Sequence, residues 1–232
     1  MLKHCTFNTK IEQMDFKELL TFLKELKDNN NREWFEENKK RYKVLQENFT
    51  LFIEMLINEI GQFDKEVAGI PAKKAVFRIY RDVRFSKDKS PYKTNFGGFI
   101  VAGGKSSGKA GYYLHIDPQG SFLAGGIYMP PTPVINLVRE SIVNNTEDFL
   151  GIINDSDFKK YFGSINGEKL KRPPKGFPAD FKEIELLKFK SYTVMHSLDE
   201  KELQSESLFS KLVDGFELMS PLNKFINHAL IA

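Results

Sequence analysis

The sequence contains a single cysteine, Cys5, among 232 residues. One cysteine excludes an internal disulfide and any zinc site built from several thiolates. No apolar run approaches the roughly 20 residues that a membrane-spanning helix needs. The N-terminus also lacks the long apolar segment of a secretory signal. We therefore expect a cytoplasmic protein with no membrane partner, no metal and no cofactor.

Established catalytic motifs are also missing. Neither a His-Glu-x-x-His zinc motif nor a Gly-x-Ser-x-Gly nucleophile elbow occurs. Residues 103–110 have glycines and a lysine at the spacing of a phosphate-binding loop. However, Ala110 stands where that loop needs a metal-binding hydroxyl, and a strand pattern follows where a helix should begin. We interpret 103–110 as a hairpin loop.

Hydrophobic periodicity predicts an α+β fold in one domain, residues 1–232. Residues 15–62 have helical spacing, with Asp15 and Asn31 as N-caps and Gly61 as the helix end. Residues 75–129 alternate as a β meander, whose short links imply antiparallel pairing. The predicted strands are 77–85, 94–102, 112–116 and 121–128.

The remainder, 134–231, has a helical pattern with one further strand, 189–196, and a helix break near Pro221. This order of elements predicts an antiparallel sheet of about five strands packed against N-terminal and C-terminal helices. Two glycines inside the last meander strand, Gly125 and Gly126, indicate either a β-bulge or the close approach of a helix or a ligand to the backbone.

The densest chemistry lies in residues 78–93. This segment carries six basic and two acidic side chains, a net +4 (6 − 2), while the whole chain carries +3. Tyrosines interleave with the basic residues. Such a cluster suits a phosphate or carboxylate, because guanidinium groups form forked hydrogen bonds to either anion. The predicted ligand contacts are Arg78, Tyr80, Arg81, Arg84, Lys87, Lys89, Tyr92 and Lys93.

The alternation of the segment separates two roles. If 77–85 is a strand, Arg81 lies in an otherwise apolar row, whereas Arg78 and Arg84 face the other way. A guanidinium in an apolar row needs a carboxylate or a ligand oxyanion. Arg81 is then part of the architecture, and Arg78, Arg84 and the lysines contact the ligand. The alternative is a solvated, salt-bridged strand face whose lysines block edge pairing.

Two residues are candidates for acid–base catalysis. Asp82 lies among the arginines and would orient one of them or act as a base. His115 shares a strand row with Tyr113, although a lone strand histidine is more often structural. A second basic loop, 169–177, supplies Lys171, Arg172 and Lys175. This loop would strengthen an anion site if it folded over the first cluster, and is otherwise a solvated loop.

Four segments, 30–35, 78–93, 125–130 and 172–177, carry a resemblance to a known family. The sequence resembles the uncharacterised family "domain of unknown function 2461" over residues 16–222. The resemblance implies a single soluble domain found mainly in bacteria, with no established activity. It therefore assigns no catalytic residue.

The sequence favours a binding module for an anionic, phosphate-bearing ligand, either a phosphorylated metabolite or a nucleic-acid backbone. One alternative is an enzyme acting on a phosphorylated or nucleic-acid substrate. Another is a structural or partner-binding protein whose basic strand pairs with acidic helices. The candidate acidic partners are Glu12, Glu18, Glu36 and Glu37.

Overall fold

A computed structural model describes residues 14–231 of the chain. Cys5 and Glu12 lie outside the described residues. The helices are α1 (Phe16–Asp28), α2 (Arg32–Phe63), η1 (Lys65–Val67), α3 (Ala72–Ala75), α4 (Thr132–Asn144), α5 (Thr146–Asn154), α6 (Ser156–Phe162), α7 (Ile184–Leu187), α8 (Glu200–Leu203) and α9 (Leu208–Ala229). None of these helices is long and apolar enough to cross a membrane.

The two predicted N-caps are confirmed. Asp15 accepts a hydrogen bond from the Glu18 amide at 2.9 Å, and Asn31 accepts one from the Trp34 amide at 2.9 Å. The predicted end of α2 was wrong, because the helix continues through Gly61 to Phe63. A Cβ at Gly61 would lie 3.2 Å from that of Ala68, so this glycine serves a close contact.

Within residues 14–231 the sheet has four antiparallel strands in the order β1-β2-β3-β4. They are β1 (Phe96–Ile100), β2 (Gly111–Ile116), β3 (Ser121–Ile127) and β4 (Tyr192–Leu198). The first three form the predicted meander. The last follows the helices α4 to α7 and pairs with β3. The α+β class is confirmed, with four strands rather than about five.

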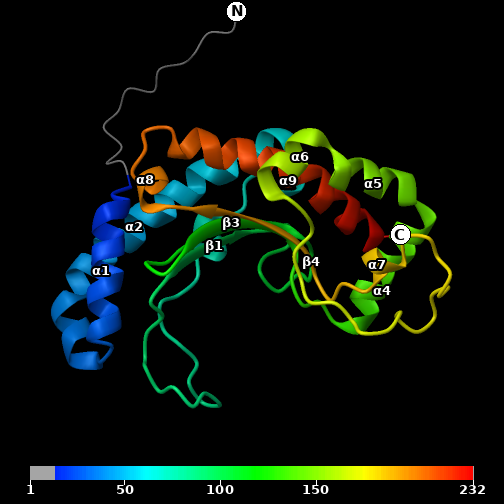
Figure 1. Cartoon of the computed structure of the whole chain (residues 1–232). Helices are drawn as coiled ribbons and strands as arrows, with labels where there is room; N and C mark the ends of the chain where they lie inside the picture. Colours follow the sequence, from blue (N-terminus) through cyan, green and yellow to red (C-terminus); the bar gives the residue numbers. More distant parts are fainter. Residues whose placement is uncertain (1–13, 232) are drawn as a thin grey trace, which may run out of the picture.

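The predicted strand 77–85 does not join the sheet. Residues 77–95, here called the arm, extend from the β1 edge as a loop (Figure 1). Only Val76 bridges to β1, at Gly98, while Tyr80 bridges to Tyr92 within the arm. The Lys93 amide donates to the Ile79 carbonyl at 2.8 Å. The prediction was wrong because the arm pairs mainly with its own returning limb.

The C-terminal helix is continuous across Pro221, so the predicted break was also wrong. Proline removes a backbone donor from a helix interior. Met219 and Leu222, on either side of it, are completely buried in the core. Tertiary packing therefore holds α9 together despite the missing hydrogen bond.

Helices α2 and α9 cover one face of the sheet (Figure 1). A Cβ at Gly98 would lie 2.5 Å from Ile53 of α2, and one at Gly125 would lie 2.0 Å from Met219 of α9. The group that approaches Gly125 is therefore a helix, one of the possibilities predicted. Glycine at these positions lets the helices pack close to the strands.

The opposite face of the sheet carries a different set of side chains. Figure 1 shows no helix across its middle. Its aromatic and small residues are partly exposed, in contrast to the buried residues that alternate with them along the strands. We call this surface the open face; it includes Phe99, Tyr113, His115, Phe122 and Ala124.

Candidate functional site

The two central arginines of the arm have carboxylate partners within the arm itself. Arg81 donates to Asp88, and also to the Ser90 carbonyl at 3.1 Å. Arg84 forms a forked pair with Asp82, with distances of 2.9 Å from Nε and 2.7 Å from Nη2. The carboxylate partner expected for Arg81 is therefore present. Arg81 thus joins the two limbs of the arm, whereas Arg84 and Asp82 form a local, exposed pair.

The same contacts hold the acidic side chains ionised. The Ser90 hydroxyl and amide, followed by Arg81, lower the pKa of Asp88 to about 2. The Arg84 side chain and amide lower the pKa of Asp82. A carboxylate with a lowered pKa accepts a proton poorly. This arrangement favours Asp82 as the residue that orients Arg84, the first of the two roles predicted for it.

The tyrosines anchor the base of the arm. Tyr92 is buried and stacks on Phe35 of α2, with ring centroids 3.9 Å apart. Its backbone amide donates to the Asn30 side-chain oxygen at 3.1 Å, and its carbonyl accepts from the Asn30 side-chain amide at 3.0 Å. Tyr80 packs against Tyr92 at 5.5 Å and remains 46% exposed. Lys89, near the tip, donates to the Val83 carbonyl at 3.0 Å, so its amine supports the turn.

Three other cations gather where the arm meets the sheet. Arg78, Lys93 and Lys105, here called the β1-edge cluster, form no ion pair with any carboxylate in residues 14–231. The amines of Lys93 and Lys105 lie 5.2 and 4.7 Å from the centre of the Phe77 ring. Lys105 was not among the predicted ligand contacts, although it lies in the loop 103–110, whose glycine and lysine spacing is that of a phosphate-binding loop.

The lysine pKa values in the cluster are those expected of cations that have no counter-charge beside them. Burial and the charge of Arg78 lower the pKa of Lys93. Burial and the charge of Lys93 lower the pKa of Lys105. Lys105 also donates to the Val76 carbonyl at 2.7 Å. An anion placed here would relieve the mutual repulsion of the three side chains.

An aromatic row continues from the cluster across the open face. Phe77 packs edge-on against Tyr113 with ring centroids 6.2 Å apart. The Tyr113 hydroxyl lies 2.8 Å from Nδ1 of His115, whose ring stacks on Phe122 at 4.6 Å. A Cβ at Gly97 would lie 2.8 Å from the Tyr113 hydroxyl, so this glycine makes room for the phenol.

Burial lowers the pKa of His115 and so favours the neutral imidazole. Asp117, with Oδ2 3.8 Å from Nε2, only partly opposes this effect. The described residues contain no group of three or more side chains that could hold a metal ion. His115 is thus a partly exposed base within an aromatic surface.

The second basic loop lies at the other edge of the sheet. The segment that leads into it bridges at Asn166 to Thr193 of β4, while the arm adjoins β1. Lys171 and Arg172 are exposed to solvent, and Lys175 lines a cavity beside α4. The loop therefore does not fold over the first cluster.

Two of the candidate acidic partners on α1 and α2 form ion pairs with residues outside the arm. Glu18 pairs with Arg41, and Glu36 pairs with Lys39. Within residues 14–231, the ion pairs of the arm involve only its own Asp82 and Asp88.

The fold and the candidate site define an α+β protein with helices on one face of its sheet and a cation-edged aromatic surface on the other. The chain belongs to the family described as conserved hypothetical protein (DUF2461), whose sequence profile matches residues 18–225. This confirms the family resemblance. Searches of curated proteins and of solved structures returned no match.

Proposed function

We propose that the protein binds a phosphate-bearing ligand with an aromatic base, a nucleotide or single-stranded nucleic acid. The β1-edge cluster would contact the phosphate, and the open face would stack the base. One observation carries the proposal: three cations without carboxylate partners adjoin a row of partly exposed aromatic rings. Proteins that bind single strands combine basic grooves with aromatic stacking in this way.

The basic residues of the arm have different contacts and therefore different proposed roles. Arg81 and Arg84 already bind carboxylates and would position the arm. Arg78 and Lys93 would bind phosphate directly, joined by Lys105. Lys87, which is exposed at the tip of the arm, would contact a longer single-stranded nucleic acid. Tyr80 would add stacking area beside the buried Tyr92.

A direct test is fluorescence anisotropy of labelled oligothymidylate and oligouridylate, with AMP as competitor. We expect the double variant Lys93→Gln/Lys105→Gln to weaken binding at least about tenfold and to reduce the salt slope by about 2, because each phosphate contact contributes about 1. Lys159→Gln, an exposed lysine on α6, is the matched control. Equal binding by the double variant and the control would refute the assignment.

Competition by AMP distinguishes a nucleotide site from a site for single-stranded nucleic acid. Displacement of the oligonucleotides by AMP at similar concentrations indicates a nucleotide site. Displacement only by longer strands indicates a nucleic-acid site. Phe122→Ala should weaken either ligand, because base–aromatic stacking is worth about 1–3 kcal/mol per base.

A second function is favoured by the Tyr113–His115 contact. A neutral imidazole within reach of a bound phosphate ester could serve as a general base. The enzyme hypothesis then predicts hydrolysis of a nucleotide or oligonucleotide. The activity would disappear in His115→Gln, while ligand affinity falls no further than in Phe122→Ala, since the change removes the proton acceptor and one ring of the open face but no phosphate contact. No hydrolysis by the wild type under saturating ligand would exclude it.

A further inference from the structure

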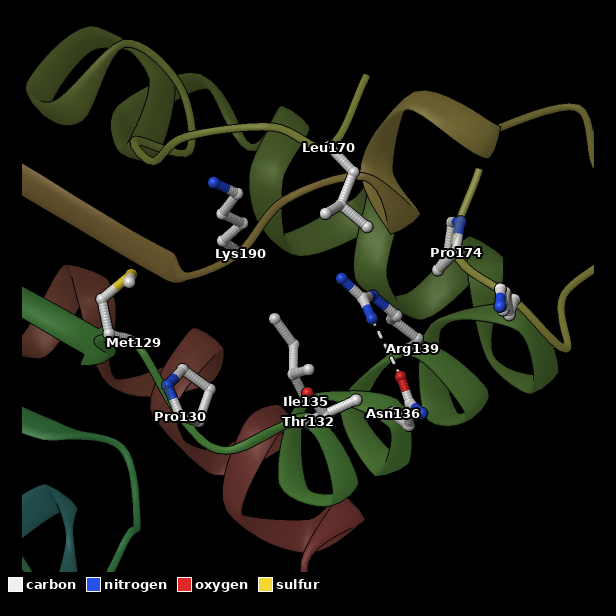
Figure 2. A pocket seen from close by; sticks show the side chains of 10 residues that line it. Met129, Pro130, Thr132, Ile135, Asn136, Arg139, Leu170, Pro174 and Lys190 are labelled. Atoms are coloured by element: carbon white, nitrogen blue, oxygen red, sulfur yellow. Dashed lines mark hydrogen bonds between the residues drawn. The ribbon is translucent and has the colours of Figure 1, made fainter. Parts of the chain in front are cut away.

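A cavity of about 420 Å³ lies at the opposite edge of the sheet from the β1-edge cluster. It is formed by the link from β3 to α4, one side of α4 and the second basic loop. Figure 2 shows the Arg139 guanidinium directed into it, with Ile135, Leu170 and Lys190 around it. The lining comprises Met129, Pro130, Thr132, Ile135, Asn136, Arg139, Leu170, Pro174, Lys175 and Lys190.

Arg139 is buried without a counter-charge. Only 4% of the residue is exposed. Its guanidinium donates to the Asn136 side chain at 2.9 Å and to the Phe189 carbonyl at 3.0 Å, both neutral groups. Its Nε has no hydrogen-bond partner among the described residues. No carboxylate within residues 14–231 forms an ion pair with it.

A buried guanidinium in this condition is costly, because it has lost water without gaining a partner of opposite charge. An anion in the cavity would supply both the charge and an acceptor for Nε. Arginine has five N–H donors, of which these two contacts use two. Donors therefore remain for a forked pair with a carboxylate or phosphate.

The surroundings of Arg139 also favour a negatively charged ligand. Lys175 and Lys190 also line the cavity, and none of the lining residues from the described part of the chain is acidic. Lys190 pairs with Glu168 at 2.8 Å, which offsets one of these charges. The first residue of α4, Thr132, lies in the lining, and that helix end has no side-chain cap. Its free amides add positive potential.

The remaining walls are apolar. Ile135, Leu170 and Pro174 contribute hydrocarbon surface. The volume falls within the range of small-molecule sites, roughly 300–1,000 Å³. At the lip, Met129 is the only non-glycine residue with positive φ in the described chain, at 45°, and its amide donates to the buried Ser191 hydroxyl at 2.9 Å.

We propose that this cavity binds a small organic anion, with its carboxylate or phosphate on Arg139 and its apolar part against Ile135 and Leu170. The site is separate from the proposed nucleotide surface and does not depend on it. A nucleic-acid backbone is not the expected occupant, because the anion must reach a buried guanidinium between apolar walls.

The test uses three probes: phenyl phosphate, hexanoate and the neutral hexanamide. Binding is followed by amide chemical shifts of the full chain and by thermal unfolding. We expect one or both anions to shift signals around α4 and to raise the melting temperature, and hexanamide to do neither. Phenyl phosphate and hexanoate distinguish a phosphate from a carboxylate site.

Arg139→Met should weaken the anion at least about tenfold, because it removes charge-assisted hydrogen bonds. Arg172→Met is the matched control, since this exposed arginine of the same loop does not line the cavity. Leu170→Trp fills the cavity while retaining Arg139, and it should also block anion binding. This second variant tests the site even if Arg139→Met fails to fold. Absence of anion binding by the wild type, or unchanged binding in Leu170→Trp, would overturn the proposal.

Discussion

The Tyr113 hydroxyl lies 2.8 Å from Nδ1 of His115, on a face of the sheet that no helix covers at its middle. The two residues belong to the same strand, two positions apart, and therefore point to the same side. Their contact joins the aromatic row to an imidazole whose pKa is lowered by burial. Protonation of His115 would therefore add a positive charge to this row.

His115 should make the protein less stable in mild acid. Its pKa in the folded state lies below the ordinary histidine value of 6.5, so the unfolded chain binds the proton more readily. The stabilisation is complete above about pH 6.5 and decreases as the pH falls toward the folded-state pKa. Urea unfolding at neutral and acidic pH should show a shallower pH dependence for His115→Gln.

His228→Gln, at the exposed last turn of α9, controls for the loss of a histidine. The groups that face His115 are Tyr113, Asp117 and Phe122. An identical pH dependence in wild type and His115→Gln would show that burial does not suppress protonation at this position.

Gly125 should tolerate no side chain while Met219 lies over it. A Cβ at this position would lie 2.0 Å from the Met219 sulfur. Gly125→Ala should therefore cost about 1–3 kcal/mol of unfolding free energy, as overpacking does. In Gly125→Ala/Met219→Ala the loss should be smaller than the sum of the single losses, measured by chemical denaturation. Additive losses would place the two residues apart.

Gly151 provides the contrasting glycine. It lies inside α5 with no atom within 4 Å of an added Cβ. Gly151→Ala should stabilise the protein by about 0.5–1 kcal/mol, because alanine loses less backbone entropy in a helix.

The Tyr112 hydroxyl should be important for stability, because it joins β2 to the end of α2. It donates to the buried carboxylate of Asp64 at 2.8 Å. Tyr112→Phe leaves that carboxylate short of a donor and should cost about 1.5–3 kcal/mol. Tyr161→Phe, whose hydroxyl donates over 3.3 Å near the surface, should cost less than about 1 kcal/mol. Equal losses in denaturant unfolding would contradict this ranking.

Asp88 should control the order of the arm more than the stability of the fold. It accepts hydrogen bonds from Ser90 and Arg81 and is exposed to solvent. Asp88→Asn should accelerate tryptic cleavage within residues 81–89 and leave the melting temperature nearly unchanged. Asp148→Asn, an exposed change on α5, serves as the control. Cleavage at the wild-type rate would mean that other contacts fix the arm.

Local patterns predicted the parts of the fold that depend on neighbouring residues. Asp15 and Asn31 each accept a hydrogen bond from an amide three residues further along the chain, and their chemistry is sufficient to identify them as caps. Gly61 and Pro221 misled the prediction because tertiary packing overrides a local preference to end a helix. Residues 77–85 alternate as a strand should, but alternation does not specify which chain the backbone pairs with.

The candidate sites also depend on contacts that local sequence patterns do not specify. The partner of Arg81 lies seven residues along the arm, and a charge count could not distinguish a self-paired arginine from a free one. Arg139 was missed, although the sequence contained a signal. It stands with Ile135, Val138 and Ile142 at the i, i+3, i+4 and i+7 positions of one helix face, all of them buried. A cation in such a stripe indicates a buried charge that needs a partner.

Irregular chain runs along both outer strands of the sheet. The Phe77 amide donates to the Gly97 carbonyl of β1 at 2.9 Å, and the Asn166 amide donates to the Thr193 carbonyl of β4 at 2.7 Å. Unpaired edge strands invite addition of strands from other molecules and lead to aggregation. The segments that adjoin the two proposed binding sites therefore also occupy edge hydrogen-bonding groups, and hinder growth of the sheet beyond one molecule.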